Sequence, residues 1–91
     1  MGRVKQKIGD INEYRAVIKF LKEGYWVFKN ISSVGPIDMI LVHEKTGEIR
    51  KIDVKTNTYR LSWKPGTRIC RQPTKEQVEL GVELVFFDKE E

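Results

Sequence analysis

Two acidic residues and one lysine lie at spacings that bring them together in a β-sheet. Asp53 and Lys55 are two positions apart in a run with alternating apolar residues, so their side chains leave the same face of a strand. Asp38 begins an earlier apolar run, directly after a Gly-Pro-Ile sequence. A short turn around Gly47 separates the two runs. This predicts an antiparallel hairpin in which Asp38 lies close to Asp53.

Two neighbouring carboxylates repel each other unless they share a proton or a cation. Lys55 cannot neutralise both, so Asp38 and Asp53 together predict a site for a divalent metal ion. Oxygen ligands suit Mg²⁺, for which Mn²⁺ can substitute, and a bound Mg²⁺ activates water and stabilises charge on a phosphodiester. Lys55 would orient or deprotonate the attacking water, or stabilise the developing charge. In the alternative without chemistry, Asp38 is a turn residue, and Asp53 and Lys55 form a weak salt bridge on an edge strand.

A third carboxylate, Glu13, belongs to a segment with helical periodicity. Its apolar residues predict an amphipathic helix over residues 10–23, which Asp10 begins and Gly24 ends. These apolar residues are Ile11, Tyr14, Val17, Ile18 and Leu21. A helix packed across the sheet can point Glu13 toward the two aspartates. The alternative is that Asp10 and Glu13 form a capping box, which needs no chemistry.

The remaining segments complete an α/β (α+β) pattern in a single domain. The predicted strands are residues 25–29, 37–43, 48–56 and 82–87, and a second short helix covers residues 74–80. The second strand is nearly all apolar, which predicts a central strand covered on both faces. Residues 57–73 are irregular, with a turn at Pro65 and Gly66 that can close a second small hairpin. The expected order is α-β-β-β-α-β, with a mixed central sheet flanked by helices.

The charge of the chain favours an anionic partner. The formal net charge is +4 and the pI is about 9.3. The basic residues expected to hold a DNA backbone are Arg3, Lys5, Lys7, Arg60, Lys64, Arg68 and Arg71. Because Tyr59 and Trp63 are interleaved with the second basic group, this segment fits a surface that follows phosphates. A solvated loop on a basic protein is the alternative.

Size and cysteine content limit the other properties of the chain. A domain of 91 residues buries only about 60% of its unfolded surface, so association with a second copy would stabilise it. No apolar run is long enough to cross a bilayer, and no signal-peptide pattern is present. The single cysteine, Cys70, excludes an intramolecular disulfide. The expected compartment is the cytoplasm, or the host cytoplasm for a virus-encoded protein.

At these residues the sequence resembles the PD-(D/E)XK nuclease superfamily. The matching pieces are Gly9 with Glu13, Gly35-Pro36-Ile37-Asp38 and Asp53-Val54-Lys55-Thr56. The carboxylate before the lysine is Asp53, where Glu is commoner in that superfamily. The element order is also that of its restriction-endonuclease-like core, so the resemblance covers nearly the whole chain. Within it, the layout is most similar to archaeal-type and phage Holliday-junction resolvases.

The resemblance implies a role for each matching residue. It implies that Asp38, Asp53 and the backbone carbonyl of Val54 bind Mg²⁺ with help from Glu13, and that Lys55 does catalytic work. It also implies a homodimer with one cut per active site. Because such proteins often carry a Gln near the site in the second helix, Gln77 is a candidate auxiliary residue; as part of a capping box with Thr74, it would be purely structural.

The expected function is that of a Mg²⁺-dependent, structure-selective DNA endonuclease of the Holliday-junction resolvase type. No motif that reads base sequence is evident, so selectivity for branched DNA would come from two paired sites and a basic surface. Two alternatives remain open. One is a nicking, flap-cutting or site-specific endonuclease with the same chemistry, and the other is a DNA-binding module without turnover.

Overall fold

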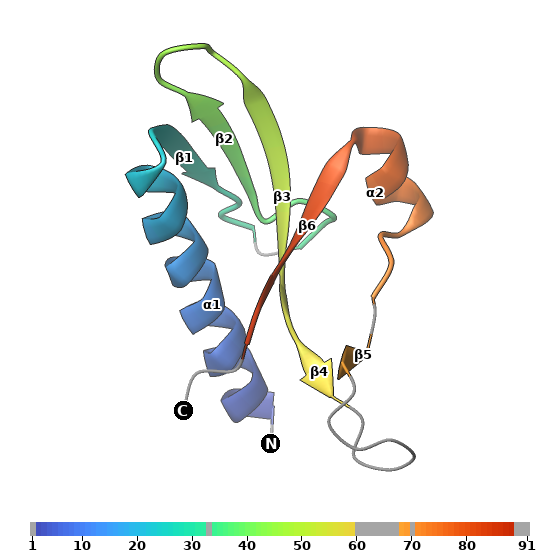
Figure 1. Cartoon of the computed structure of the whole chain (residues 1–91). Coiled ribbons are helices and arrows are strands. Elements are labelled where there is room, and N and C mark those ends of the chain that lie inside the picture. Colours follow the sequence, from blue (N-terminus) through green and yellow to red (C-terminus); the bar gives the residue numbers. More distant parts are fainter. Residues whose placement is uncertain (1, 33, 60–67, 70, 89–91) are drawn as a thin grey trace.

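A computed structural model describes residues 2–32, 34–59, 68–69 and 71–88; for residues 2–6, 58–59 and 68–69 it describes the backbone alone (Figure 1). The elements are α1 (Gly2–Lys22), β1 (Tyr25–Lys29), β2 (Met39–His43), β3 (Ile49–Thr56), β4 (Thr58–Tyr59), β5 (Arg68–Ile69), α2 (Lys75–Leu80) and β6 (Val82–Phe87). The protein is therefore α+β, with two helices and a four-stranded mixed sheet, as the broad class predicts. Within the described ranges, neither helix is long and apolar enough to cross a membrane.

The strands of the main sheet lie in the order β1-β2-β3-β6. The first three are antiparallel neighbours, as predicted for the hairpin that turns at Gly47, and β6 runs parallel to β3. A parallel pair needs a crossover connection, which here contains α2. The strand β3 is interior in the sheet order, but β2 pairs with it only as far as Ile52. The salt bridge between Asp53 and Lys55 that the alternative interpretation expected is present, beyond the end of β2. The short strands β4 and β5 form a separate antiparallel pair.

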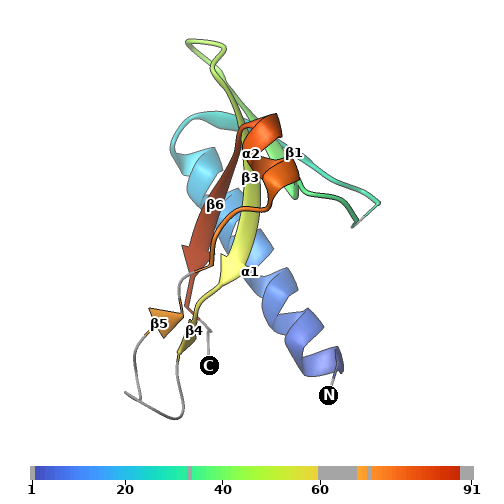
Figure 2. The ribbon, with the colours of Figure 1, turned by 90° about the vertical axis from the view of Figure 1, so that its right-hand side faces the viewer.

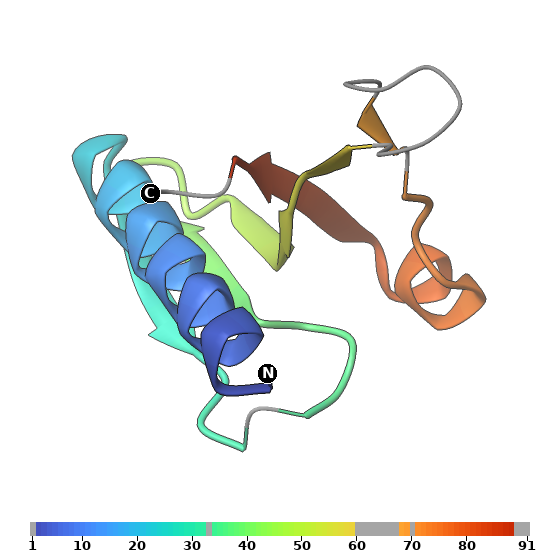
Figure 3. The same cartoon turned by 90° about the horizontal axis from the view of Figure 1, so that it is seen from below.

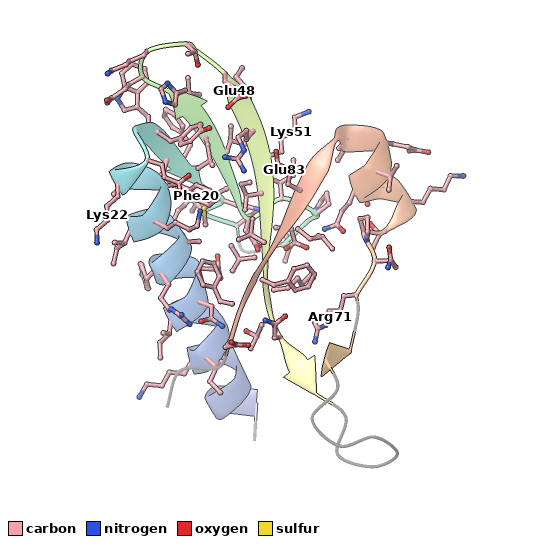
Figure 4. All side chains as sticks on the ribbon, viewed as in Figure 1. Phe20, Lys22, Glu48, Lys51, Arg71 and Glu83 are labelled. Atoms are coloured by element: carbon pink, nitrogen blue, oxygen red, sulfur yellow. The ribbon has the colours of Figure 1, made fainter. Side chains whose placement is uncertain are left out.

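The hydrophobic core lies between α1 and one face of the main sheet. Its fully buried members are Ala16, Phe20, Met39, Leu41 and Ile52. Figure 4 shows Phe20 between the helix and the strands. Because side chains alternate along a strand, β3 turns Ile52 and Val54 into this core and Asp53 and Lys55 toward the other face. The prediction that the apolar residues alternating with Asp53 and Lys55 lie on the opposite face of the strand is thereby confirmed.

The helix α1 begins much earlier than predicted. It starts at Gly2, so Asp10 lies inside the helix and does not cap it. The residues upstream of Asp10 include good helix formers such as Lys and Gln, and the interior Gly9 costs only about 1 kcal/mol. The interpretation of Asp10 and Glu13 as a capping box is therefore wrong. The predicted end of the helix is confirmed, since α1 ends at Lys22 and Gly24 has a positive φ of 91°.

The face of α1 that packs on the sheet differs in part from the prediction, although Val17 packs against the core as expected. The helix buries Asn12, Ala16 and Phe20, at intervals of four residues, while Tyr14, Ile18 and Leu21 are 61%, 54% and 54% exposed. The sequence contains two rows of residues with helical spacing, and periodicity alone does not distinguish them. The buried row combines the small Ala16 with the large Phe20, which allows the helix to pack closely on the strands. Because the row also contains the polar Asn12, its apolar pattern is weak in the sequence.

On the face of the sheet that is turned away from α1, only the half formed by β3 and β6 is covered by a helix, among the residues described. Figure 2 shows α2 in front of β3 and β6, with α1 behind the sheet, and Figure 3 shows the two helices far apart. The helix α2 is six residues long and does not extend over β1 and β2. Ile40 of β2 is accordingly 37% exposed. The strand β2 is central, as predicted, but the expectation that both its faces are covered is wrong.

Candidate active site and metal centre

The two aspartates of the predicted site lie directly opposite each other. Met39 of β2 pairs with Ile52 of β3, so the next residues outward, Asp38 and Asp53, face one another at the end of the hairpin. The backbone N–H of Asp38 donates to the Ile52 carbonyl over 2.8 Å. Its carboxylate Oδ2 accepts from the Val54 N–H over 2.6 Å. Asp38 is thus fixed to β3 through both its backbone and its side chain.

The loop before Asp38 is organised by Asn30, a residue that the sequence analysis did not single out. The side-chain nitrogen of Asn30 donates to the carbonyls of Val34 and Ile37, over 2.8 and 2.9 Å. Its backbone N–H donates to the Asp38 carbonyl over 2.9 Å. Gly35, with φ of 104°, provides the left-handed conformation inside this loop. These bonds hold Asp38 at the entrance of β2.

Asp53 is buried, with 6% of its surface exposed, and its charge is compensated locally. Its Oδ2 lies 3.1 Å from the ammonium nitrogen of Lys55, which remains one-third exposed. The same oxygen accepts a hydrogen bond of 2.7 Å from the side-chain amide of Gln77. A buried carboxylate with two such donors has a fixed orientation, while the exposed part of Lys55 is left on the accessible side of the site.

Gln77 uses every polar group of its side chain within the protein. It is 4% exposed, and its Nε2 donates to Asp53 and also to the Pro36 carbonyl over 3.0 Å. Its Oε1 accepts from the Thr74 N–H, completing the predicted capping box of α2. Gln77 is therefore more than a helix cap, because it joins α2 to one aspartate and to the loop that precedes the other. The sequence alone does not predict that Gln77 bonds to Pro36 and Asp53.

The two carboxyl groups interact strongly. Burial, and next the hydrogen bond with Asp53, raise the pKa of Asp38 from 3.8 to about 6, and the hydrogen bond from the Val54 N–H opposes this increase. The negative charges of Asp53 and Glu13 raise it further. A proton on Asp38 relieves the repulsion between the two groups below about pH 6, and at neutral pH a bound cation would do so. Such a pair has a strong preference for any cation that can replace the proton.

Glu13 influences the pair electrostatically from α1. Its neighbour Asn12 is 1% exposed and donates to the hydroxyl of Thr56 over 2.7 Å. Arg15 donates in turn to Asn12 Oδ1 over 2.8 Å. These contacts attach α1 to the end of β3, next to Lys55. Asn12 is a second residue that the sequence analysis missed, because a buried asparagine on a helix has no distinctive pattern.

The donor groups suit a hard divalent cation that keeps part of its hydration shell. Over the described ranges, no three His, Cys, Asp or Glu side chains cluster closely enough to hold a metal ion, so Asp38 and Asp53 form the direct pair and Glu13 lies outside it. The carbonyl of Val54 points to the same edge of β3 as its N–H, beyond the end of β2. Two carboxylates and a carbonyl, completed by waters or phosphate oxygens, are a typical environment for Mg²⁺.

The predicted DNA-binding residues are only partly described. Lys7 on α1 and Arg71, between β5 and α2, are exposed. Figure 4 shows Arg71 on the segment that leads to α2. The side chains of Arg3, Lys5 and Arg68, and the whole of Arg60 and Lys64, lie outside the described residues.

Compared with known proteins, the chain matches no protein-family model, no curated protein and no solved structure.

Proposed function

We propose that the chain is a Mg²⁺-dependent DNA endonuclease with a restriction-endonuclease-like core of the PD-(D/E)XK type. The observation that carries this proposal is the pair of opposed carboxyl groups, Asp38 and Asp53, with Lys55 at 3.1 Å from the second. A purely structural pair would be expensive, because two carboxyl groups placed together in a partly buried position destabilise a small domain. Function is a sufficient reason to retain them.

The residues divide the chemical work among themselves. Asp38, Asp53 and the Val54 carbonyl would hold Mg²⁺, which supplies a water of lowered pKa and neutralises charge on the phosphodiester. Lys55, an ammonium paired with Asp53, orients the attacking water, and its positive charge stabilises the pentavalent phosphorus transition state. Gln77 keeps Asp53 in one orientation. Glu13 adds negative charge near Asp38 and strengthens the attraction for a cation.

The proposed substrate is branched DNA, most specifically a four-way junction cut by a homodimer. The net charge of +4 and the exposed Lys7 and Arg71 support a phosphate-binding surface. Among the described elements the two helices are separated in the chain by strands, so they form no helix-turn-helix unit of the kind that reads bases in the major groove. Selectivity for the shape of the DNA then depends on the placement of two sites.

The test is cleavage of end-labelled DNA in Mg²⁺. Four-way junction, flap, single-stranded and linear duplex substrates are compared for the wild type, Lys55→Ala and the control Lys45→Ala. Lys45 is an exposed lysine in the turn between β2 and β3, far along the hairpin from Asp53. We expect paired cuts confined to the junction, a loss of at least 100-fold in Lys55→Ala, and unchanged activity in Lys45→Ala.

Each other outcome has a definite meaning. Equal cleavage of all substrates retains the nuclease and excludes the resolvase assignment. Cleavage of flap or nicked duplex alone supports the related endonuclease activities. If the folded protein binds DNA and cuts none of the substrates with Mg²⁺ or Mn²⁺, the proposal is wrong and the chain is a DNA-binding module.

A further inference from the structure

A groove of about 470 Å³ runs along the edge of α1 that adjoins the end of β6, and we call it the α1–β6 groove. Figure 1 shows the end of β6 close to this helix. The lining is mostly apolar, with Ile18 from α1 and Phe87 from β6. Because a helix rises 1.5 Å per residue, the groove extends over about 10 Å along α1, which is the length of about three residues of extended chain. The described residues that line it are Arg15, Ile18, Lys19, Lys22, Glu23 and Phe87.

The rim of the α1–β6 groove is basic. Arg15, Lys19 and Lys22 follow one another at intervals of four and three residues, so they lie on the same side of the helix. With Glu23, three cations and one carboxylate give the groove a net charge of +2. Glu23 forms an ion pair of 2.5 Å with Lys19. Lys22 is exposed and forms no ion pair with any other described residue, and Figure 4 shows it extending from the end of α1.

Arg15 joins the basic rim to the apolar lining. Its guanidinium lies 4.9 Å from the centre of the Phe87 ring. It also donates to the Asp88 carbonyl and to Asn12 Oδ1, over 2.8 Å in each case. These contacts hold the cation and the ring in fixed relative positions before any ligand is bound. A site that is ordered in advance loses less conformational entropy on binding.

The helix dipole is a competing reason for part of this pattern. Lys19 and Lys22 belong to the last turn of α1, where basic side chains offset the partial negative charge of the helix end. The dipole gives no reason for an apolar lining between the cations, where Ile18 is 54% exposed. The combination of a basic rim with an apolar centre is instead typical of a surface that binds another protein.

We propose that the α1–β6 groove binds an acidic peptide segment of a partner protein. One large apolar side chain of the peptide packs on Ile18 and Phe87, and the carboxylates beside it pair with Lys22 and Arg15. A nucleic acid has the right charge but fits the lining less well, because stacked bases need an exposed aromatic face. Phe87 is the one aromatic ring among the described lining residues, it packs against the core, and Arg15 covers it.

The groove and the candidate active site lie on opposite sides of the sheet. Phe87 packs against the core that α1 covers, whereas Asp53 and Lys55 turn toward the other face. A peptide in the groove therefore leaves the candidate site open to its own substrate. The groove would attach the protein to a partner without taking part in its chemistry, so the proposal does not rest on the nuclease function.

The experiment titrates a fluorescein-labelled peptide, four aspartates around a central phenylalanine, with the whole chain and follows its fluorescence anisotropy. Lys22→Glu is compared with Lys75→Glu, which makes the same change of charge at an exposed lysine on α2. Ile18→Ala is compared with Leu21→Ala, because both side chains are 54% exposed on α1 and Leu21 does not line the groove. Circular dichroism checks that each variant is folded.

We expect the wild type, Lys75→Glu and Leu21→Ala to bind the peptide with the same Kd within about twofold at 0.15 M salt, where the Debye length is about 8 Å. Lys22→Glu should weaken binding at least about fivefold, since it replaces an attraction with a repulsion. Ile18→Ala should weaken it at least about threefold, since it removes apolar contact. Replacing the phenylalanine of the peptide with alanine should have an effect at least as large as that of Ile18→Ala.

Each other result would overturn the proposal. Failure of the wild type to bind the peptide at concentrations up to about 1 mM excludes this ligand. Equal losses in Lys22→Glu and Lys75→Glu, or binding that is independent of the phenylalanine, would mean that net charge alone attracts the peptide. If the peptide binds only after residues 89–91 are removed, the groove holds Glu90 and Glu91 of the chain itself.

Displacement of the peptide by duplex DNA would likewise overturn the proposal, since it would assign the basic rim to a DNA-binding surface. None of these measurements involves cleavage. A protein that cuts no DNA can therefore still confirm the peptide site, and an active nuclease that binds no peptide excludes it.

Discussion

The side-chain amide of Gln77 on α2 donates a hydrogen bond of 2.7 Å to Oδ2 of Asp53 on β3. The same nitrogen donates to the Pro36 carbonyl, and the side-chain oxygen accepts from Thr74. One buried residue thus holds together the short helix, the interior strand and the loop that leads to Asp38. Its role is to position the site, since its bonding groups are already used within the protein.

Replacing Gln77 with Leu is expected to lower the free energy of unfolding by about 2–3 kcal/mol, because it removes the acceptor of the Thr74 N–H in the capping box and leaves a buried carboxylate with one donor fewer. Urea unfolding at neutral pH measures this change. Glu79→Ala, at an exposed position of the same helix, should change it by less than about 0.5 kcal/mol.

A second variant separates the two functions of Gln77. Gln77→Glu retains an oxygen for the Thr74 N–H but places a carboxylate against Asp53. Like charges at this distance repel, so the variant should regain stability relative to wild type as the pH is lowered from 7 to 4. Equal stability of the Leu variant and the wild type would show that the bond to Asp53 contributes nothing to folding.

The raised pKa of Asp38 predicts a pH dependence of stability in the presence of a chelator. The folded protein binds this proton more tightly than the unfolded chain, since the pKa rises from 3.8 to about 6. The contribution of Asp38 is therefore complete below about pH 4 and is lost as the pH rises through 6. Allowing for screening by solvent, we expect about 1–2 kcal/mol. The difference in unfolding free energy between wild type and Asp38→Asn should fall by that amount between pH 4 and pH 7, and a difference independent of pH would contradict the shared proton.

Mn²⁺ should raise the melting temperature of the wild type at neutral pH. A ligand that binds the native state alone stabilises it by about 2.7 kcal/mol at 100 times its Kd. Asp53→Asn removes one of the two opposed carboxylates and should abolish the shift, whereas Glu44→Gln, an exposed carboxylate near the hairpin turn, should retain it. A shift of the same size in Asp53→Asn would place the metal elsewhere on the protein.

Local patterns in the sequence were sufficient to predict the parts of the site that depend on neighbours along the chain. The two-residue period of strands correctly predicted that Ile52 is buried while Asp53 turns to the opposite face. The turn at Gly47 predicted the hairpin that opposes Asp38 to Asp53. Capping chemistry predicted the bond between Thr74 and Gln77. Each of these relations is determined within one hairpin or one helical turn.

The parts that could not be predicted depend on which surfaces meet. In α1, two apolar rows satisfy the same periodicity, and packing against the sheet selects the one that contains Asn12. The exposure of Ile40 follows from the short reach of α2, which no pattern in β2 records. The bond from Gln77 to Asp53 spans 24 residues, and that from Asn12 to Thr56 spans 44. Such contacts are decided by the tertiary fold.

The contact between Asn12 and Thr56 gives a prediction about how α1 is attached. Asn12 is almost fully buried, and its amide donates to the Thr56 hydroxyl over 2.7 Å while its carbonyl accepts from Arg15. Asn12→Ala should therefore cost about 2–3 kcal/mol of unfolding free energy, since it removes the donor to the Thr56 hydroxyl and one of the acceptors of Arg15, which still donates to the Asp88 carbonyl. Thr56→Val should cost less, because it keeps the volume and the bond from Arg15.

A double-mutant cycle isolates the bond itself. If Asn12 and Thr56 interact directly, the double variant should lose about 1 kcal/mol less than the sum of the single losses. Asn12→Ala paired with Tyr14→Ala, an exposed residue on the opposite side of α1, provides the additive reference. Additive losses in both cycles would mean that the bond between Asn12 and Thr56 contributes nothing and that α1 is held by its other contacts, such as those of Ala16, Val17 and Phe20. In that case the position of Glu13 relative to Asp38 would not be set by Asn12.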